Sequence, residues 1–361
     1  MAEGIRCALM RGGSSKGAYF EEGDLPSAEA DRHDLLMRIL GTPDPRQIDG
    51  IGGAHPLTSK VAVVRPSAAD GIDLDYLFLQ VQVDRPEVSD SQNCGNLLAG
   101  VGPFGVERGL IDIDPSAAEA TVRILMRNTG SVATAGFPVH QGRPVYEGDT
   151  AISSVPGTAA AVRLDFEGIA GGSAGALLPT GAVADRIDGV ACTLIDNGMP
   201  VVVMAAASLG VTGYEACADL EADASLRTRL EAIRLEAGPL MNLGDVGAKS
   251  VPKLTLVAPP LDGGHLCTRT FIPHRCHDAI GVLGAVSVGT AAMLAGSPAA
   301  EVSAPIAGES VMVEHPTGSF EAVIVIDTTD GVPAVERAGI VRTARMLMDG
   351  RVFPRPRPGR A

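Results

Sequence analysis

The sequence contains no tryptophan, and aromatic residues make up only 3% of its 361 residues. Glycine is abundant instead, with 44 residues, and hydrophobic residues reach 45%. Small and β-branched side chains suit closely packed strands better than long coiled helices. The chain is also longer than the roughly 250–300 residues at which a single hydrophobic core stops growing. We therefore expect a strand-rich α+β protein with two lobes.

Positive charge is scarce. The chain has 29 lysine and arginine residues against 43 aspartate and glutamate residues, which gives a formal net charge of −14. Nucleic acids and anionic membranes are held by accumulated Lys and Arg side chains. The composition therefore argues against both as partners. A small anionic ligand would have to be bound by a few local positive groups.

The 6 cysteines are scattered and form no C-x-x-C pair, and the chain starts without a positively charged leader before an apolar run. We therefore expect reduced thiols and a cytoplasmic location. The apolar runs at 201–207 and 285–295 are too short or too interrupted to span a bilayer.

A Gly/Ala/Ser stretch at 168–175 predicts the boundary between the lobes. The expected organisation is an N-terminal lobe at 1–172, a C-terminal lobe at 173–340 and a tail at 341–361. Prolines among arginines near the end indicate that this tail is partly frayed. Each half carries strands, a polar turn and a helix of small residues, which indicates weak internal duplication.

Periodicity and stop signals predict the main elements. A helix is expected at 31–40, and a second at 96–109 that Gly100, Gly102 and Pro103 should kink or break. Further helices are expected at 223–238 and from about Asp278. The expected strands cover 61–64, 76–83, 120–128, 161–166, 191–195, 201–205, 253–257 and 265–271.

Residues 11–17, with the sequence Arg-Gly-Gly-Ser-Ser-Lys-Gly, are predicted to form a turn between two extended segments. The turn does not fit the phosphate-loop pattern, and no helix follows it, so nucleotide binding is not expected. A backbone nest with the Ser14 and Ser15 hydroxyls and the Lys16 ammonium would suit a carboxylate. We name Arg11 with these three residues as substrate-binding candidates.

The segment Asn93, Cys94, Gly95 and Asn96 precedes a predicted helix. Open backbone N–H groups and the helix dipole make such a start an anion site, so we name Asn93, Gly95 and Asn96 as substrate-binding candidates. A helix N-terminus also favours a thiolate, which would make Cys94 an acid/base group. The alternative for Gly- and Ala-rich helices is simply close packing.

Lys60 leads directly into the apolar strand at 61–64, whereas the other lysines are Lys16, Lys249 and Lys253. Desolvation lowers a lysine pKa and makes the amine a usable base. The alternative is that the side chain snorkels to solvent.

A histidine and cysteine cluster at 265–277 resembles a zinc site, but Arg269 and Arg275 interrupt it with charges that a cation repels. We therefore expect no metal. Hydrolase, zincin and dinucleotide motifs are also missing, so no cofactor is expected. Arg269 and Arg275 are named instead as further substrate-binding candidates.

Five ordered motifs, at 10–20, 58–64, 93–96, 196–200 and 315–318, together resemble the PrpF family. The resemblance implies the diaminopimelate-epimerase-like fold, in which two pseudo-symmetric lobes each wrap a strand-rich layer around a central helix. It also implies that Lys60 is the catalytic lysine and Cys94 the cysteine of the cleft. No second thiol aligns securely at the start of the second helix, which argues against racemisation.

The resemblance implies a cofactor-independent isomerase that shifts a proton on a small tricarboxylate. Its expected substrate is 4-oxalomesaconate, from the breakdown of gallate and protocatechuate. The alternatives are 2-methylaconitate cis-trans isomerisation and a non-catalytic accessory protein of an aconitase-like enzyme. The sequence leaves open whether one base or two residues carry the proton, and whether the chain forms a homodimer.

Overall fold

The computed structural model describes residues 4–90, 93–329 and 331–357. The chain divides into two compact units. Unit 1 is built from the described residues within Met1–Leu164 and Arg342–Ala361, and unit 2 is Asp165–Val341. The C-terminal segment therefore belongs to the same unit as the N-terminus.

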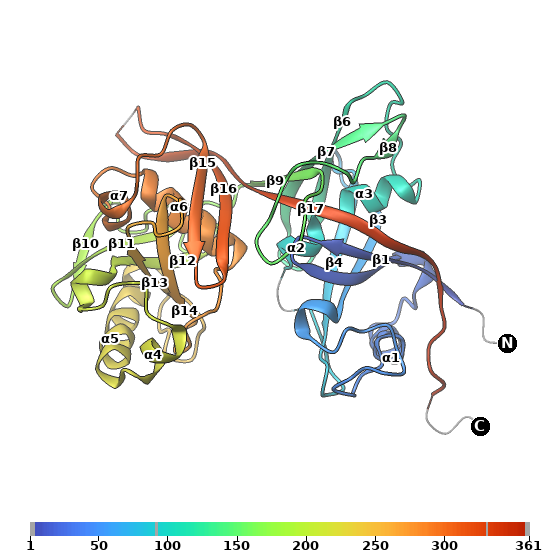
Figure 1. The fold of residues 1–361 in the computed structure, drawn as a ribbon, viewed down its shortest axis with the longest axis horizontal. Coiled ribbons are helices and arrows are strands. Elements are labelled where there is room, and N and C mark those ends of the chain that lie inside the picture. The colour runs from blue at the N-terminus through green and yellow to red at the C-terminus, as the bar shows by residue number, and fades with distance from the viewer. Residues whose placement is uncertain (1–3, 91–92, 330, 358–361) are drawn as a thin grey trace. The chain divides into compact units, whose positions relative to one another are not determined.

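In unit 1 the strands close into a ring (Figure 1). Each strand of the ring pairs with the next, β9 pairs with both β7 and β17, and β17 pairs with β1. Closure of this kind gives each described strand of the ring a partner on both sides. In order, the ring strands are β1 (Ile5–Gly12), β2 (Ser15–Glu21), β3 (Lys60–Pro66), β4 (Leu74–Val81), β6 (Glu119–Met126), β7 (Ser131–His140), β9 (Ala161–Glu167) and β17 (Ala334–Val352). The short strands β5 (Val88–Ser89) and β8 (Arg143–Pro144) pair with β4 and β7.

Three helices pack against these strands. Helix α1 (Glu29–Leu40) ends at Gly41, whose φ of 84° permits the left-handed cap that donates to the Met37 carbonyl. Its buried leucines and isoleucine join Phe20 and Val63 in one hydrophobic core. On the other face of the sheet, α2 (Gly95–Leu98) contacts β1 and β2, and α3 (Val101–Glu107) contacts β3 and β4.

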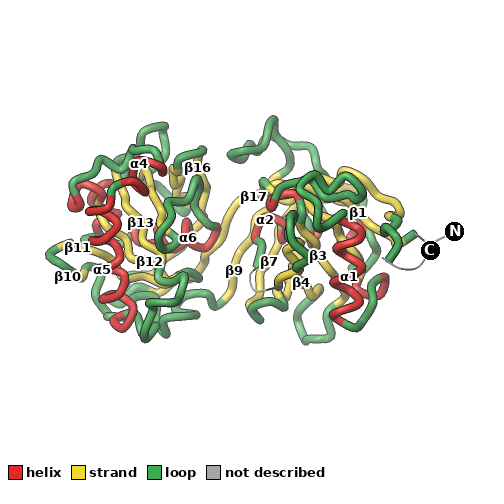
Figure 2. The backbone as a smooth tube through the Cα atoms, turned by 90° about the horizontal axis from the view of Figure 1, so that it is seen from below, coloured by secondary structure: helices red, strands yellow, loops and turns green. Residues whose placement is uncertain are grey.

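Unit 2 contains a mixed sheet whose strands pair in chain order up to β17. Helix α6 contacts β11, β12, β15 and β16, while α5 lies along β10 and β13 (Figure 2). The strands are β10 (Asp185–Ile187), β11 (Val190–Asp196), β12 (Pro200–Ala205), β13 (Lys253–Ala258), β14 (Leu266–Phe271), β15 (Ser310–His315) and β16 (Gly318–Asp327), and the helices are α4 (Cys217–Ala222), α5 (Ala224–Leu240), α6 (Val282–Met293) and α7 (Pro298–Val302). Short 3-10 turns occupy Glu22–Asp24, Pro56–Thr58 and Ala206–Leu209.

The α+β class is confirmed, and the expected strands and helices are present with small shifts at their ends. The helix expected at 96–109 is broken into α2 and α3 near Gly100, as its glycines and proline predicted. The residues Ser91 and Gln92 that precede it lie outside the described part of the chain.

Two expectations were wrong. The segment 341–352 is not a tail, because β17 continues through it and pairs with β1 from Ile5 to Gly12. The turn at 11–17 is much shorter than expected, since Gly12 already pairs with Ser15 across a two-residue hairpin. The positive φ of Gly13, 52°, permits this tight connection. Arg11 and Lys16 are therefore strand residues, and the turn offers no extended backbone nest.

Among the described residues, no helix combines the length and the apolar character needed to cross a membrane.

Candidate active site

Lys60 opens β3 and is only 7% exposed. Its amine Nζ donates a 2.7 Å hydrogen bond to Oε1 of Gln80, the residue directly opposite on β4. The amine also lies 4.9 Å from the centre of the Phe78 ring. The amine of Lys60 is therefore held inside unit 1 rather than extended into solvent.

The amide of Gln80 has a fixed orientation. Its Nε2 donates to the backbone carbonyls of Pro56 and Ser59, each at 3.1 Å. Because both amide hydrogens point toward these carbonyls, Oε1 must face Lys60. Lys60 thus has a neutral acceptor beside it rather than a carboxylate.

Cys94 is half-buried and immediately precedes α2. Its carbonyl accepts a 3.3 Å hydrogen bond from the hydroxyl of Tyr76. Tyr76 and Phe78 are two residues apart on β4, so they share a face of the strand. The Cys94 carbonyl contacts Tyr76 and the Lys60 amine contacts Phe78, so both residues lie on the same face of β4.

Two buried tyrosines support α2 as hydrogen-bond donors. Burial raises the pKa of Tyr19 and of Tyr76 well above the usual range, so both phenols stay protonated. The Tyr19 hydroxyl donates to the Leu97 carbonyl at 2.6 Å. These two bonds fix the start of α2 relative to β2 and β4.

The β1–β2 hairpin packs closely against Asn96. A Cβ added to Gly12 would lie 2.4 Å from the Asn96 carbonyl oxygen, and one added to Gly13 would lie 2.1 Å from Asn96 Oδ1. Asn96 Nδ2 also donates to the hydroxyl of Ser14 at 3.2 Å. The two glycines thus permit the contact that joins the hairpin to α2.

Several polar atoms in this region have no protein partner within the described residues. They are Ser15 Oγ, Asn93 Oδ1 and Asn96 Oδ1, all buried. Buried polar atoms are usually hydrogen-bonded, and unpaired ones call for an explanation such as a bound ligand. The Asn93 amide is otherwise held by Thr129, to which its Nδ2 donates at 2.7 Å.

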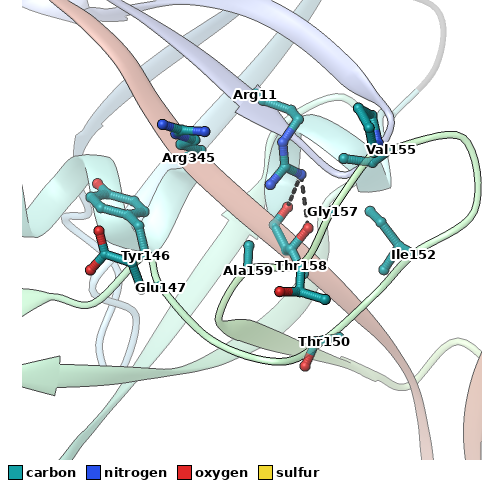
Figure 3. A pocket seen from close by; sticks show the side chains of 12 residues that line it. Arg11, Tyr146, Glu147, Thr150, Ile152, Val155, Gly157, Thr158, Ala159 and Arg345 are labelled. Atoms are coloured by element: carbon teal, nitrogen blue, oxygen red, sulfur yellow. Dashed lines mark hydrogen bonds between the residues drawn. The ribbon is translucent and has the colours of Figure 1, made fainter.

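The strand register separates Arg11 and Lys16 from Lys60. Gly17 of β2 lies beside Lys60, so Lys16 projects from the opposite face, and Arg11 faces Lys16 across the hairpin. Arg11 instead lines a separate pocket of about 170 Å³ in unit 1, with Tyr146 and Arg345 (Figure 3). The structure therefore groups Ser14, Ser15, Asn96, Lys60 and Cys94, but not Arg11 and Lys16.

The two arginine candidates of the second half lie in unit 2. Arg269 is buried, and its guanidinium donates to the carbonyls of Glu215 and Thr268 at 2.7 and 2.9 Å. The side chain of Arg275 is 84% exposed and pairs with Glu221 at 3.6 Å. Protein groups thus already engage both guanidinium groups.

The histidine and cysteine cluster does not converge. His265 Nδ1 accepts from the backbone N–H of Met312 at 2.8 Å, and the Cys267 thiol faces the Gly213 carbonyl. Within the described ranges, no group of three or more His, Cys, Asp or Glu side chains is arranged to hold a metal ion.

Two of the sequence motifs are structural anchors for α6 and the segment before it. Asn197 Nδ2 donates to Thr290 Oγ1 at 2.8 Å, and Ser287 of the same helix donates to the Met199 carbonyl at 2.7 Å. Thr317, from the motif at 315–318, donates to the Asp278 carbonyl at 2.7 Å.

The amino-acid pattern did not predict Gln80, Phe78 or Tyr76 as neighbours of Lys60 and Cys94. Gln80 did carry a signal, because it is a polar residue inside a strand whose other positions are almost all apolar. A buried amide in such a strand needs partners, and here one of them is Lys60.

The chain resembles known proteins over nearly its full length. The family described as PrpF protein matches residues 3–355. A (4E)-oxalomesaconate Delta-isomerase of Novosphingobium is 56% identical, over 96% of this chain and 96% of that protein. A 4-oxalomesaconate tautomerase of Pseudomonas putida is 55% identical, over 96% of this chain and 95% of that protein.

A solved structure has a similar fold over nearly the full length of the chain. The crystal structure of a methylitaconate-delta-isomerase superposes with a TM-score of 0.88 at 31% identity, and the match covers 98% of this chain and 96% of that one.

Proposed function

The chain belongs to the PrpF family, and on that premise we propose that it is an isomerase that shifts a proton on 4-oxalomesaconate. The observation that carries the proposal is the high identity, over nearly the whole chain, to two relatives named for this substrate. The expected setting is the degradation of aromatic acids such as gallate and protocatechuate.

We propose that Lys60, in its unprotonated form, removes the activated proton from carbon. The electron pair left behind spreads over the conjugated keto acid as a dienolate. Lys60 or Cys94 then returns one proton at another position, so that no atom is gained or lost and no redox cofactor is needed. The support is that the Lys60 amine lies over the Phe78 ring and that the Cys94 carbonyl accepts a hydrogen bond from Tyr76, two residues that share one face of β4.

Stabilising the dienolate requires donors that are in place before the reaction. We propose the Ser14 and Ser15 hydroxyls and the backbone near Gly95 and Asn96 for this role. Ser15 Oγ is buried without a protein partner in the described part of unit 1, so its hydroxyl is available to a substrate oxygen.

We also propose that each unit is one lobe of the diaminopimelate-epimerase-like fold, with strands around a central helix. In unit 1 the contacts of α2 and α3 with the ring strands support this arrangement. In unit 2 the support is α6, which is buried over most of its length and contacts strands from both halves of the sheet.

The likeness to a methylitaconate isomerase structure favours a second candidate function, which is the isomerisation of a substrate without the keto group, such as 2-methylaconitate. An ultraviolet assay of the purified protein against 4-oxalomesaconate and 2-methylaconitate separates the two. We expect the much larger kcat/KM with 4-oxalomesaconate. A preference for methylaconitate would support the second candidate, and no turnover of either by the protein alone would support an accessory role.

A further inference from the structure

Three cations form a row across adjacent strands of unit 1. Arg345 of β17 lies directly opposite Arg11 of β1, and Arg11 lies directly opposite Lys16 of β2. Residues directly opposite in antiparallel strands project from the same face, and like charges in such pairs destabilise the sheet. A bound anion would relieve the repulsion within this row.

Acidic side chains of the protein do not supply this relief. Within residues 4–90, 93–329 and 331–357, no carboxylate lies within ion-pair distance of Arg11, Lys16 or Arg345. Several other partly exposed arginines do pair with acids, among them Arg65, Arg127, Arg163, Arg229, Arg337 and Arg357.

Arg11 and Arg345 both line the pocket of about 170 Å³, together with Tyr146 and the hydroxyl-bearing Thr150 and Thr158 (Figure 3). One carboxylate, that of Glu147, also lines the pocket. Burial, and then the charge of Arg345, lower the pKa of Arg11.

The guanidinium of Arg11 is held in a fixed orientation. Its Nη1 donates to the Gly13 carbonyl at 2.9 Å, to the Thr343 carbonyl at 3.1 Å and to Thr343 Oγ1 at 2.8 Å. A guanidinium has five N–H donors, so the bonds made by Nη1 leave the Nε and Nη2 hydrogens for another acceptor. Charge-assisted bonds from such an edge suit a carboxylate or a phosphate.

We propose that this pocket binds a small oxyanion, a carboxylate or phosphate group, between Arg11 and Arg345. The register places it on the face of the sheet opposite Lys60, so it is distinct from the candidate active site. It is nevertheless connected to that site, because Arg11 holds the carbonyl of Gly13, and Gly13 packs against Asn96. The proposal does not depend on the proposed function.

Calorimetric titration of the full chain, at constant ionic strength, tests the site with inorganic phosphate and with succinate as separate probes. We expect saturable binding of at least one probe, and its preference identifies the class of oxyanion. Arg345→Gln should weaken that binding at least about tenfold, which is the loss expected from one charge-assisted hydrogen bond.

The matched control is Arg186→Gln, because Arg186 is exposed, lies in unit 2, and donates only to the Gly189 carbonyl among the described residues. It should bind both probes as the wild type does. Absence of saturable binding by either probe would overturn the proposal. Equal affinity of the wild type and Arg345→Gln would also overturn it, since an anion bound elsewhere, the active site included, would give that result.

Discussion

Nζ of Lys60 donates a 2.7 Å hydrogen bond to Oε1 of Gln80, and two backbone carbonyls fix the orientation of that Gln80 amide. A neutral acceptor can orient an amine without binding its proton as strongly as a carboxylate would. The pairing is therefore suited to a lysine that has to work as a base.

Replacing Gln80 should affect the rate. In Gln80→Glu, the new carboxylate should form an ion pair with the Lys60 ammonium in place of the neutral hydrogen bond, so we expect at least about a tenfold loss of kcat near neutrality. Gln80→Met removes the acceptor at similar size and should also lower kcat. Steady-state kinetics of both variants check this, and an unchanged kcat in Gln80→Glu would argue against the role of the amide.

Lys60→Met should lose at least about a hundredfold in turnover, the low end for removal of a general base. The side chain of methionine fills similar space, so the fold should persist. Lys249→Met, at an exposed lysine of unit 2, is the matched control and should keep wild-type activity. If Lys60→Met folds normally and turns over 4-oxalomesaconate at a near-normal rate, another residue must be the base.

Cys94→Ser should retain measurable isomerisation, and far more than Lys60→Met. Serine keeps a donor before α2 but lacks the acidity of the thiol, and a 1,3 shift can in principle be carried by one base on one face. Product formed in deuterium oxide provides the check, because a single base sometimes returns the proton that it removed. Complete deuterium incorporation in the first turnover, with an inactive Cys94→Ser enzyme, would instead establish a two-residue relay.

Glu231→Gln should reduce stability in a pH-dependent manner. Hydrogen bonds from the buried Arg234, at 2.7 and 2.8 Å, lower the pKa of the Glu231 carboxyl. A lowered folded-state pKa contributes stability above the unfolded-state value, and this stability is lost as pH falls through the folded-state value. Urea unfolding should therefore show a deficit of about 1.5–3 kcal/mol at neutral pH that shrinks in acid.

The exposed Glu236, on the same helix α5, is the control for that experiment. Glu236→Gln should follow the wild-type stability curve at each pH. An equal deficit in Glu231→Gln at neutral and acid pH would mean that the loss does not come from the ionised carboxylate.

Local signals in the sequence predicted much of the fold. Gly41 follows the last buried turn of α1 and ends it, and Gly100 lies where the next helix breaks. Lys60 precedes an apolar run, which is enough to predict a poorly solvated amine at a strand mouth. These features depend on neighbouring residues, so a single sequence can carry them.

Other features depend on pairing between strands that are far apart in the sequence, so neighbouring residues could not predict them. Strand β17 alternates poorly, since residues 338–340 and 342–344 are consecutively buried, and its partner β1 lies at the other end of the chain. The separation of Lys16 from Ser15 depends on the hairpin being two residues long, which determines the face of each side chain. The partner of Lys60 depends on the β3–β4 register, which places Gln80 opposite it.

The closure of the ring in unit 1 by β17 has a consequence for synthesis. A ribosome produces β1, β2 and most of the other ring strands first, but the strand that pairs with β1 is near the end of the chain. At roughly 5–20 residues per second, unit 2 is translated completely before the part of β17 that pairs with β1 emerges. The half of the protein that is made first is therefore the half that completes its fold last, with one edge of β1 awaiting residues 344–352.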